Sequence, residues 1–123
     1  MGKILLADDD KIMLGLLTTL LKMEGDESTA VTRPEEVVPA ARRECPDIIL
    51  MDVHLIGGSA LEALQTLKSD PKLQHIPVLM ISGMDVEDQC RRMGADDFIM
   101  KPFRPSELLQ RLHTTMENKD FSN

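Results

Sequence analysis

Short apolar runs alternate with longer amphipathic stretches along the whole chain. Residues 47–53 and 78–82 are almost continuously apolar, which is typical of strands that are buried on both faces. Between such runs, apolar residues recur at helical spacing, most clearly over residues 12–23. The alternation predicts an α/β fold in which helices cover both faces of a five-stranded parallel sheet.

Ten elements are predicted in strict order of strand and helix. The predicted strands are residues 4–7, 27–32, 47–53, 78–82 and 98–101. The predicted helices are residues 12–23, 35–45, 59–68, 86–93 and 105–117. Pro34 suits the first turn of the second helix. Pro39 lies inside that helix and is expected to kink or delay it, because proline lacks a backbone N–H.

Length and composition indicate one globular domain. The chain has 123 residues, 42% of them hydrophobic and 28% charged, and we expect a domain over residues 1–118 with a short polar tail over 119–123. The sequence contains no apolar run of the roughly 18 residues that a membrane span needs, and acidic residues interrupt its start too early for a signal peptide. We therefore expect a cytoplasmic protein in which Cys45 and Cys90 are reduced thiols.

The net charge of −7 argues against direct binding of nucleic acid, which normally requires a basic surface. Such a charge suits a protein that binds cations or basic patches of other proteins, although a generic acidic surface would look the same.

Charged and hydroxyl side chains mark the carboxyl ends of four predicted strands. In open parallel sheets, ligands bind at this edge. The side chains are Asp8, Asp9 and Asp10 after the first strand, Asp52 in the third, Ser82 in the fourth and Lys101 in the fifth. Each alone is more often a turn or capping residue, but their convergence on one edge suggests shared chemistry.

Clustered carboxylates suit Mg²⁺, which prefers oxygen ligands and often bridges to phosphate. A divalent ion, a lysine and a hydroxyl can position a phosphoryl group and neutralise its oxygens, and a carboxylate can act as the nucleophile.

The ordered motifs "LADDD", "ILMDVHL", "ISG" and "KPF" resemble the receiver domain of two-component response regulators. The resemblance spans about residues 3–117 and implies the flavodoxin-like, CheY-like (βα)5 topology. It implies that Asp52 is the phosphoacceptor and that Lys101 pairs with a phosphoryl oxygen. Asp8, Asp9, Asp52 and the backbone carbonyl of His54 would hold Mg²⁺, for which Mn²⁺ is expected to substitute.

The resemblance also implies a switch made of the Ser82 hydroxyl and the aromatic ring of Phe98. Asp10 is then left as a solvated or helix-capping residue. The imidazole of His54 is a poor ligand for a hard cation, and we expect His75 and His113 to be surface residues.

The chain departs from the family pattern in two places. Ile56 and Ala60 stand where relatives usually carry proline and glycine, which leaves the path of the loop after Asp52 open. Between Ser82 and Lys101 the chain is about three residues short, close to one helical turn, so we expect a shortened fourth helix. In the family, that helix together with the fifth strand and fifth helix carries the output, so partner choice or dimerisation is expected to differ.

The resemblance thus predicts a phosphoacceptor signalling domain and not an enzyme, apart from self-directed phosphotransfer and autodephosphorylation. Its expected partners are a histidine kinase or phosphotransfer protein and a downstream protein target. It would act as a monomer or as a phosphorylation-dependent dimer. We expect a single-domain regulator, with an excised receiver of a longer protein as the alternative.

Three other classes of protein are alternatives to a working receiver. An aspartyl phosphatase or phosphotransferase typically shows a second Asp two residues after the nucleophile, where "DVH" has none. A flavin-binding module would require a Ser/Thr-rich phosphate loop after the first strand, where "DDDK" would repel phosphate. A degenerate receiver kept only for protein interaction remains the third alternative.

Overall fold

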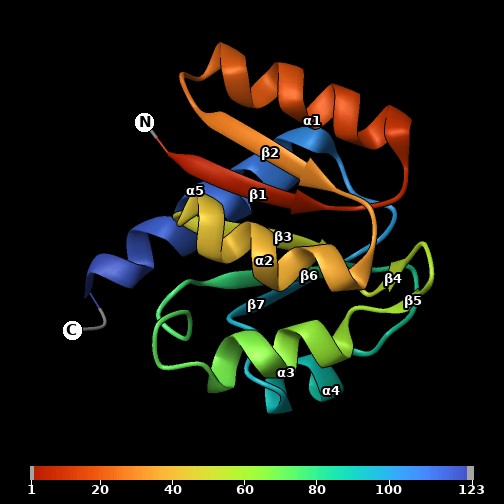
Figure 1. Cartoon of the computed structure of the whole chain (residues 1–123). Helices are drawn as coiled ribbons and strands as arrows, with labels where there is room; N and C mark the ends of the chain where they lie inside the picture. The colour runs from red at the N-terminus through yellow and green to blue at the C-terminus, as the bar shows by residue number, and fades with distance from the viewer. Residues whose placement is uncertain (1, 122–123) are drawn as a thin grey trace.

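A twisted parallel β-sheet forms the centre of the molecule (Figure 1). The computed structural model describes the backbone of residues 2–121 and the side chains of residues 2–117. The sheet has five strands in the order β2-β1-β3-β6-β7, all parallel. The strands are β1 (Lys3–Ala7), β2 (Glu27–Val31), β3 (Ile48–Asp52), β6 (Val78–Ser82) and β7 (Asp97–Met100). The predicted parallel sheet is confirmed.

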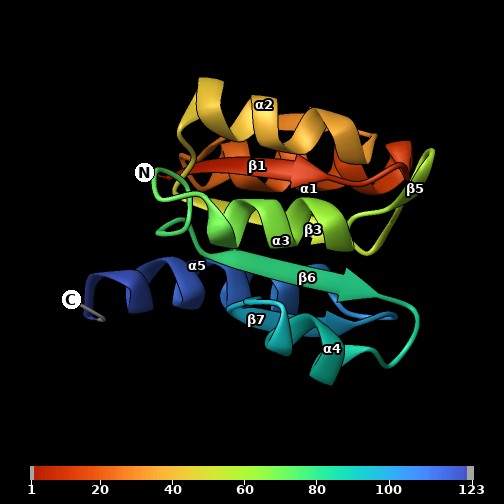
Figure 2. The same ribbon diagram turned by 60° about the horizontal axis from the view of Figure 1, so that its bottom comes forward.

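Helices cover both faces of the sheet (Figures 1 and 2). They are α1 (Lys11–Met23), α2 (Pro34–Glu44), α3 (Leu61–Ser69), α4 (Glu87–Arg92) and α5 (Pro105–Phe121). One core cluster joins the sheet to α1 and α5, and the other joins it to α2, α3 and α4. Residues within a strand alternate between the two clusters, as Leu5 and Leu6 do, because successive side chains point to opposite faces.

The predicted elements are all present, with changes at their ends. Helix α2 runs through Pro39 without a break, so the expected delay is wrong. Helix α4 has only six residues, which confirms the shortened fourth helix. Helix α5 begins at Pro105 as predicted and continues to Phe121, four residues beyond the predicted end at residue 117. The last two residues of the expected tail, 122 and 123, lie outside the described part of the chain.

A two-stranded hairpin that the sequence analysis did not predict follows β3. Strands β4 (His54–Leu55) and β5 (Gly58–Ser59) pair antiparallel. Gly57 and Gly58 adopt φ values of +95° and +148°, which only glycine reaches without strain. The N–H of Ile56 donates to the carbonyl of Thr32 (3.1 Å), which ties the hairpin to the end of β2. Helix α3 therefore begins at Leu61, two residues later than predicted.

His113 is not the surface residue that we expected. Its Nε2 lies 2.8 Å from the carboxylate of Asp26, and its Nδ1 lies 3.4 Å from that of Glu24. The Asp26 carboxylate also accepts a 2.7 Å hydrogen bond from the N–H of Gly2. These contacts connect α5 to the turn between α1 and β2, far along the sequence from His113, which explains why no local pattern indicated them.

Both cysteines are free, in agreement with the prediction, with Cys45 exposed and Cys90 buried. Within the described residues, none of the helices combines the length and the apolar composition that crossing a membrane requires.

Substitution by alanine should have opposite effects on the free energy of unfolding at two glycines. Gly15 lies on the exposed side of α1 with open space around its Cα, so Gly15→Ala should raise the free energy of unfolding by about 0.5–1 kcal/mol. Gly94 has φ +106°, and an added Cβ would lie 2.7 Å from Cγ of Lys68, so Gly94→Ala should lower the free energy of unfolding by about 1–3 kcal/mol. Urea unfolding of both variants measures the difference, and equal effects would contradict the described path after α4.

Candidate functional site

The residues that were predicted to form the site do lie at one edge of the sheet. Asp8 directly follows β1, and Asp52 ends β3; these strands are neighbours, with Ala7 opposite Met51. Ser82 ends β6 and lies opposite Met100, the last residue of β7. The carboxyl ends of three adjacent strands and the residue after β7 thus supply the side chains, as expected for an open parallel sheet.

Asp52 and Lys101 form the central ion pair of this edge. The Nζ of Lys101 lies 2.5 Å from Oδ2 of Asp52, and the Asp52 side chain is only 6% exposed. The other carboxylate oxygen, Oδ1, accepts a 3.0 Å hydrogen bond from the N–H of His54. Burial acts to lower the pKa of Lys101, but the hydrogen bond to Asp52 and the nearby negative charges outweigh it, so the pKa is raised. Lys101 is therefore held as a cation against the Asp52 carboxylate.

Asp8 lies at the same edge of the sheet and is almost completely buried. Its Oδ1 accepts from the N–H of Asp10 (3.0 Å), whereas its Oδ2 is buried without a hydrogen-bond partner among the residues that the structure describes. Burial raises the pKa of Asp8, and the negative charge of Asp52 adds to this effect, while the Asp10 N–H and the Lys101 cation oppose it. A buried carboxylate oxygen that lacks a partner is costly, which makes it a natural ligand for a cation.

The other two residues of the acidic run differ in role. Asp9 is exposed to solvent. Asp10 caps α1, where its side chain accepts hydrogen bonds from the N–H groups of Ile12 (3.0 Å) and Met13 (3.1 Å). The capping interpretation of Asp10 is confirmed.

The donor set at this edge fits a hard divalent cation. Asp8 offers an unpartnered carboxylate oxygen, Asp52 a second carboxylate close by, and Asp9 a third that solvent can reach. Oxygen donors of this kind, with access for water, are the environment that Mg²⁺ prefers. The side chain of His54 is exposed, and its N–H donates to Asp52. The use of the His54 carbonyl as a metal ligand stays a prediction.

A second group of side chains that could bind a metal ion, formed by Glu24, Asp26 and His113, lies where the turn before β2 meets α5. It is distinct from the predicted magnesium site.

Ser82 and Phe98, the two residues of the predicted switch, are both buried. Ser82 is fully buried, and its Oγ accepts a 3.0 Å hydrogen bond from the N–H of Met84. The ring of Phe98 is only 5% exposed and belongs to the core cluster that includes Cys90 of α4. A displacement of either side chain would therefore disturb the loop before α4 or the packing beneath it.

The arrangement of these site residues agrees with that of an established protein family. A sequence model described as the response regulator receiver domain matches residues 4–113. The chain belongs to this family. Receivers are signalling domains of two-component systems, and the CheY-like fold predicted from the sequence is confirmed.

Individual relatives of this receiver differ in length. The DNA-binding response regulator MtrA of Mycolicibacterium paratuberculosis is 31% identical over 96% of this chain, which covers 52% of that protein. The two-component response regulator-like APRR1 of Arabidopsis thaliana is 38% identical over 87% of the chain and 18% of its own length. The chain therefore spans about half of the first relative and less than a fifth of the second.

A solved structure shows the same fold from end to end. The CheY-like receiver domain protein of Methanospirillum hungatei superposes with a TM-score of 0.90, covering 100% of this chain and 99% of that one, at 23% identity.

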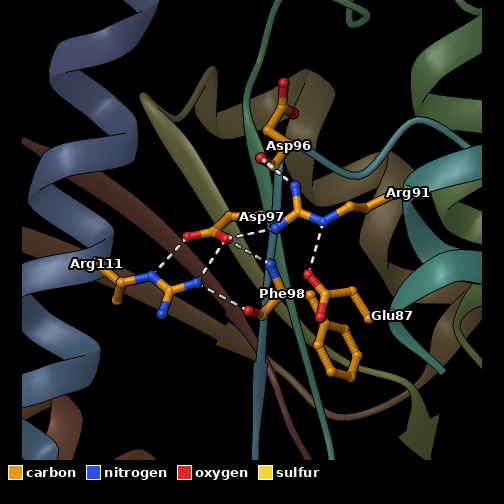
Figure 3. Close-up of polar contacts among 6 residues, drawn as sticks. All are labelled: Glu87, Arg91, Asp96, Asp97, Phe98 and Arg111. Atoms are coloured by element: carbon orange, nitrogen blue, oxygen red, sulfur yellow. Dashed lines mark hydrogen bonds and ion pairs between the residues drawn. The ribbon is translucent and has the colours of Figure 1, made fainter. Parts of the chain in front are cut away.

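An ionic cluster that the sequence analysis missed surrounds the backbone of Phe98 (Figure 3). The carboxylate of Asp97 accepts from Nε and a terminal nitrogen of Arg111 (2.8 and 2.6 Å), from Arg91 (3.1 Å) and from the N–H of Phe98 (2.8 Å). Burial acts to raise the pKa of Asp97, but the hydrogen bonds from Arg111 and Phe98 outweigh it and lower the pKa. The partners lie on three elements, so no local pattern revealed them.

The lowered pKa of Asp97 predicts a pH-dependent contribution to stability. This contribution should be complete above the unfolded-state pKa, near 3.8, and disappear as the pH falls through the lower folded-state value. Asp97→Asn should therefore lower the free energy of unfolding near neutral pH by on the order of 1 kcal/mol, since its arginine partners are partly exposed. The difference from wild type should shrink towards pH 3. Urea unfolding at several pH values measures it, and a constant difference would contradict the assignment.

Proposed function

We propose that this receiver accepts a phosphoryl group on Asp52. The observation that carries the proposal is the ion pair between the buried Asp52 carboxylate and Lys101, beside the oxygen of Asp8 that has no partner among the described residues. A carboxylate held at a strand end, with a fixed cation next to it and cation ligands around it, is equipped for phosphoryl transfer, which depends mostly on positioning and charge neutralisation.

The chemistry follows from these groups. A carboxylate oxygen of Asp52 attacks phosphorus, the bond from phosphorus to the donor nitrogen breaks, and the donor imidazole keeps the electron pair and takes up a proton. Lys101 then neutralises a phosphoryl oxygen instead of the free carboxylate. Asp8, Asp9, Asp52 and the carbonyl of His54 would hold Mg²⁺, which when bound neutralises charge on the transferred group.

The surface beside the site supports a protein as the phosphoryl donor. Helix α1 starts next to the acidic run and exposes Ile12, Leu16 and Met23, with Ile12 86% accessible. Exposed apolar side chains grouped on one helix are typical of surfaces that another protein covers. We propose a histidine kinase or phosphotransfer protein as the donor, acting in the cytoplasm, where the two free thiols would persist.

The output in this proposal is a change in protein–protein contacts through Ser82, Phe98 and the face formed by α4, β7 and α5. The downstream target would be a protein, bound by a monomer or by a phosphorylation-dependent dimer. DNA binding is a property of the MtrA relative, of which this chain covers 52%. The proposed role is that of a phosphoacceptor, with no substrate turned over beyond its own phosphorylation and dephosphorylation.

Labelling with acetyl phosphate tests the acceptor. Wild type should gain one phosphoryl group, seen by intact mass or on a phosphate-affinity gel, only when Mg²⁺ is present. Asp52→Asn should gain none, because the nucleophilic carboxylate is gone. If wild type is labelled by neither acetyl phosphate nor a cognate kinase, the chain is a degenerate receiver and the proposal fails.

Ser82→Ala should leave Asp52 open to phosphorylation but weaken the conformational response. The hydroxyl that now accepts from the Met84 N–H would no longer be available to the phosphoryl group. Amide chemical shifts recorded with and without beryllofluoride measure the response, which should be smaller than in wild type and restored in Ser82→Thr. Equal shift patterns in wild type and Ser82→Ala would refute the switch role of Ser82.

A further inference from the structure

We propose that Asp97 is a positioning residue that passes the conformational change at Phe98 to α4 and α5 through its ion pairs with Arg91 and Arg111. This inference rests on the proposed function, because it concerns how the phosphorylation of Asp52 would reach the surface. It assigns the coupling to particular side chains of this receiver.

Asp97 is bound by both helices that flank β7. Arg91 comes from α4 and Arg111 from α5, and both donate to Oδ1 of Asp97 (Figure 3). The same oxygen accepts the N–H of Phe98, and Arg111 also donates to the Phe98 carbonyl at 2.9 Å. The backbone of the proposed switch residue and the two output helices therefore share one charged centre, and a repacking of the Phe98 ring that shifts its backbone N–H and carbonyl changes these bonds.

Helix α4 depends on this centre to an unusual degree. It has six residues, its only buried side chain is Cys90, and it lacks a side-chain hydrogen bond at its N-cap. Arg91 supplies its polar attachment: it donates to Asp97 and, more weakly, to the carbonyl of Asp96 (3.4 Å), and pairs with Glu87 at 2.8 Å within the helix. A helix this short is not stable alone, so its position follows the contacts that hold it.

Helix α5 is attached in a different way. Its apolar face packs through Leu108, Leu109 and Leu112 into the opposite core cluster. Arg111 adds a two-pronged contact with the Asp97 carboxylate, a geometry that restricts orientation as well as distance. The hydrogen bond to Asp97 raises the pKa of Arg111, so this contact stays charged. We therefore expect movement mainly at α4, with α5 as the anchored side.

Cys90 offers a direct probe of α4. It is fully buried beneath the helix, so N-ethylmaleimide can reach its thiol only when α4 opens from β7. All proteins would carry Cys45→Ser, which removes the exposed thiol. The alkylation rate of Cys90 is then followed by intact mass, with and without beryllofluoride and Mg²⁺ as a mimic of the phosphorylated state.

The variants separate the cluster from the rest of α4. Arg91→Ala removes the α4 arm and Asp97→Asn removes the central charge. Arg92→Ala is the matched control: Arg92 neighbours Arg91 on α4, is also exposed, and has no ion pair among the described side chains. Arg91 is exposed enough that its replacement should not unfold the domain, so the test does not depend on the folding of Asp97→Asn alone.

In wild type, beryllofluoride should change the Cys90 alkylation rate by at least about threefold. Arg91→Ala should raise the rate of the free protein by about fivefold, the scale of one partly exposed ion pair. In Arg91→Ala and Asp97→Asn the response to beryllofluoride should be lost, whereas Arg92→Ala should keep it. A merely structural role would change the basal rate and leave the response intact.

Three results would overturn the inference. Arg91→Ala could keep the wild-type response, Arg92→Ala could lose it equally, or wild type could show no response although acetyl phosphate labels Asp52. In each case the proposed phosphoacceptor role of Asp52 stands, because labelling of Asp52 is measured separately. A wild-type protein that is never labelled would overturn the proposed function and, with it, this inference.

Discussion

Burial of both faces of the β-sheet leaves its carboxyl edge as the place where charged side chains of neighbouring strands meet. Helices cover the two faces, so the central strands β3 and β6 contain no polar side chain until their last residue. Asp52 and Ser82 are those last residues, and Asp8 and Lys101 come one position later. The same constraint that requires an apolar strand therefore delivers its polar end to the site.

The electrostatics of this edge are unbalanced in a way that suits a cation. Two buried carboxylates, those of Asp8 and Asp52, lie together with one lysine. The lysine satisfies Asp52, but one oxygen of Asp8 has no partner within the described part of the chain, and the pKa of Asp8 is raised. A divalent ion would remove this imbalance, and an added phosphoryl group would draw Lys101 away from the carboxylate it now pairs with.

Strand β7 connects the proposed chemistry with the proposed output over a few residues. Lys101 follows the strand at the site, Phe98 lies in its middle within the core, and Asp97 binds α4 and α5 at its start. As an edge strand, β7 has a neighbouring strand on one side only. It can therefore respond to the site without rearranging the rest of the sheet, and its side-chain contacts decide which helix moves with it.

Three features of the sequence were enough to predict the parallel sheet, the short fourth helix and the charged residues at the carboxyl edge of the sheet. They are the alternation of apolar runs, the four motifs at strand ends and the short segment before Lys101. The sheet and its polar edge follow from local patterns and from the rule that parallel strands end together, whereas the short fourth helix follows from the resemblance to the receiver family, which is itself carried by short motifs. The polar contacts of Asp97 with Arg91 and Arg111, and of His113 with Asp26, were not predicted, because their partners are brought together only when helices pack on the sheet. The hairpin over residues 54–59 was also missed, since its two-residue strands are too short to show a period and depend on Gly57 and Gly58 and on the contact with Thr32.

The sequence by itself thus determined the fold and where the site residues lie, whereas the tertiary structure decided which charges pair, because pairing depends on distances between elements that no sequence spacing encodes.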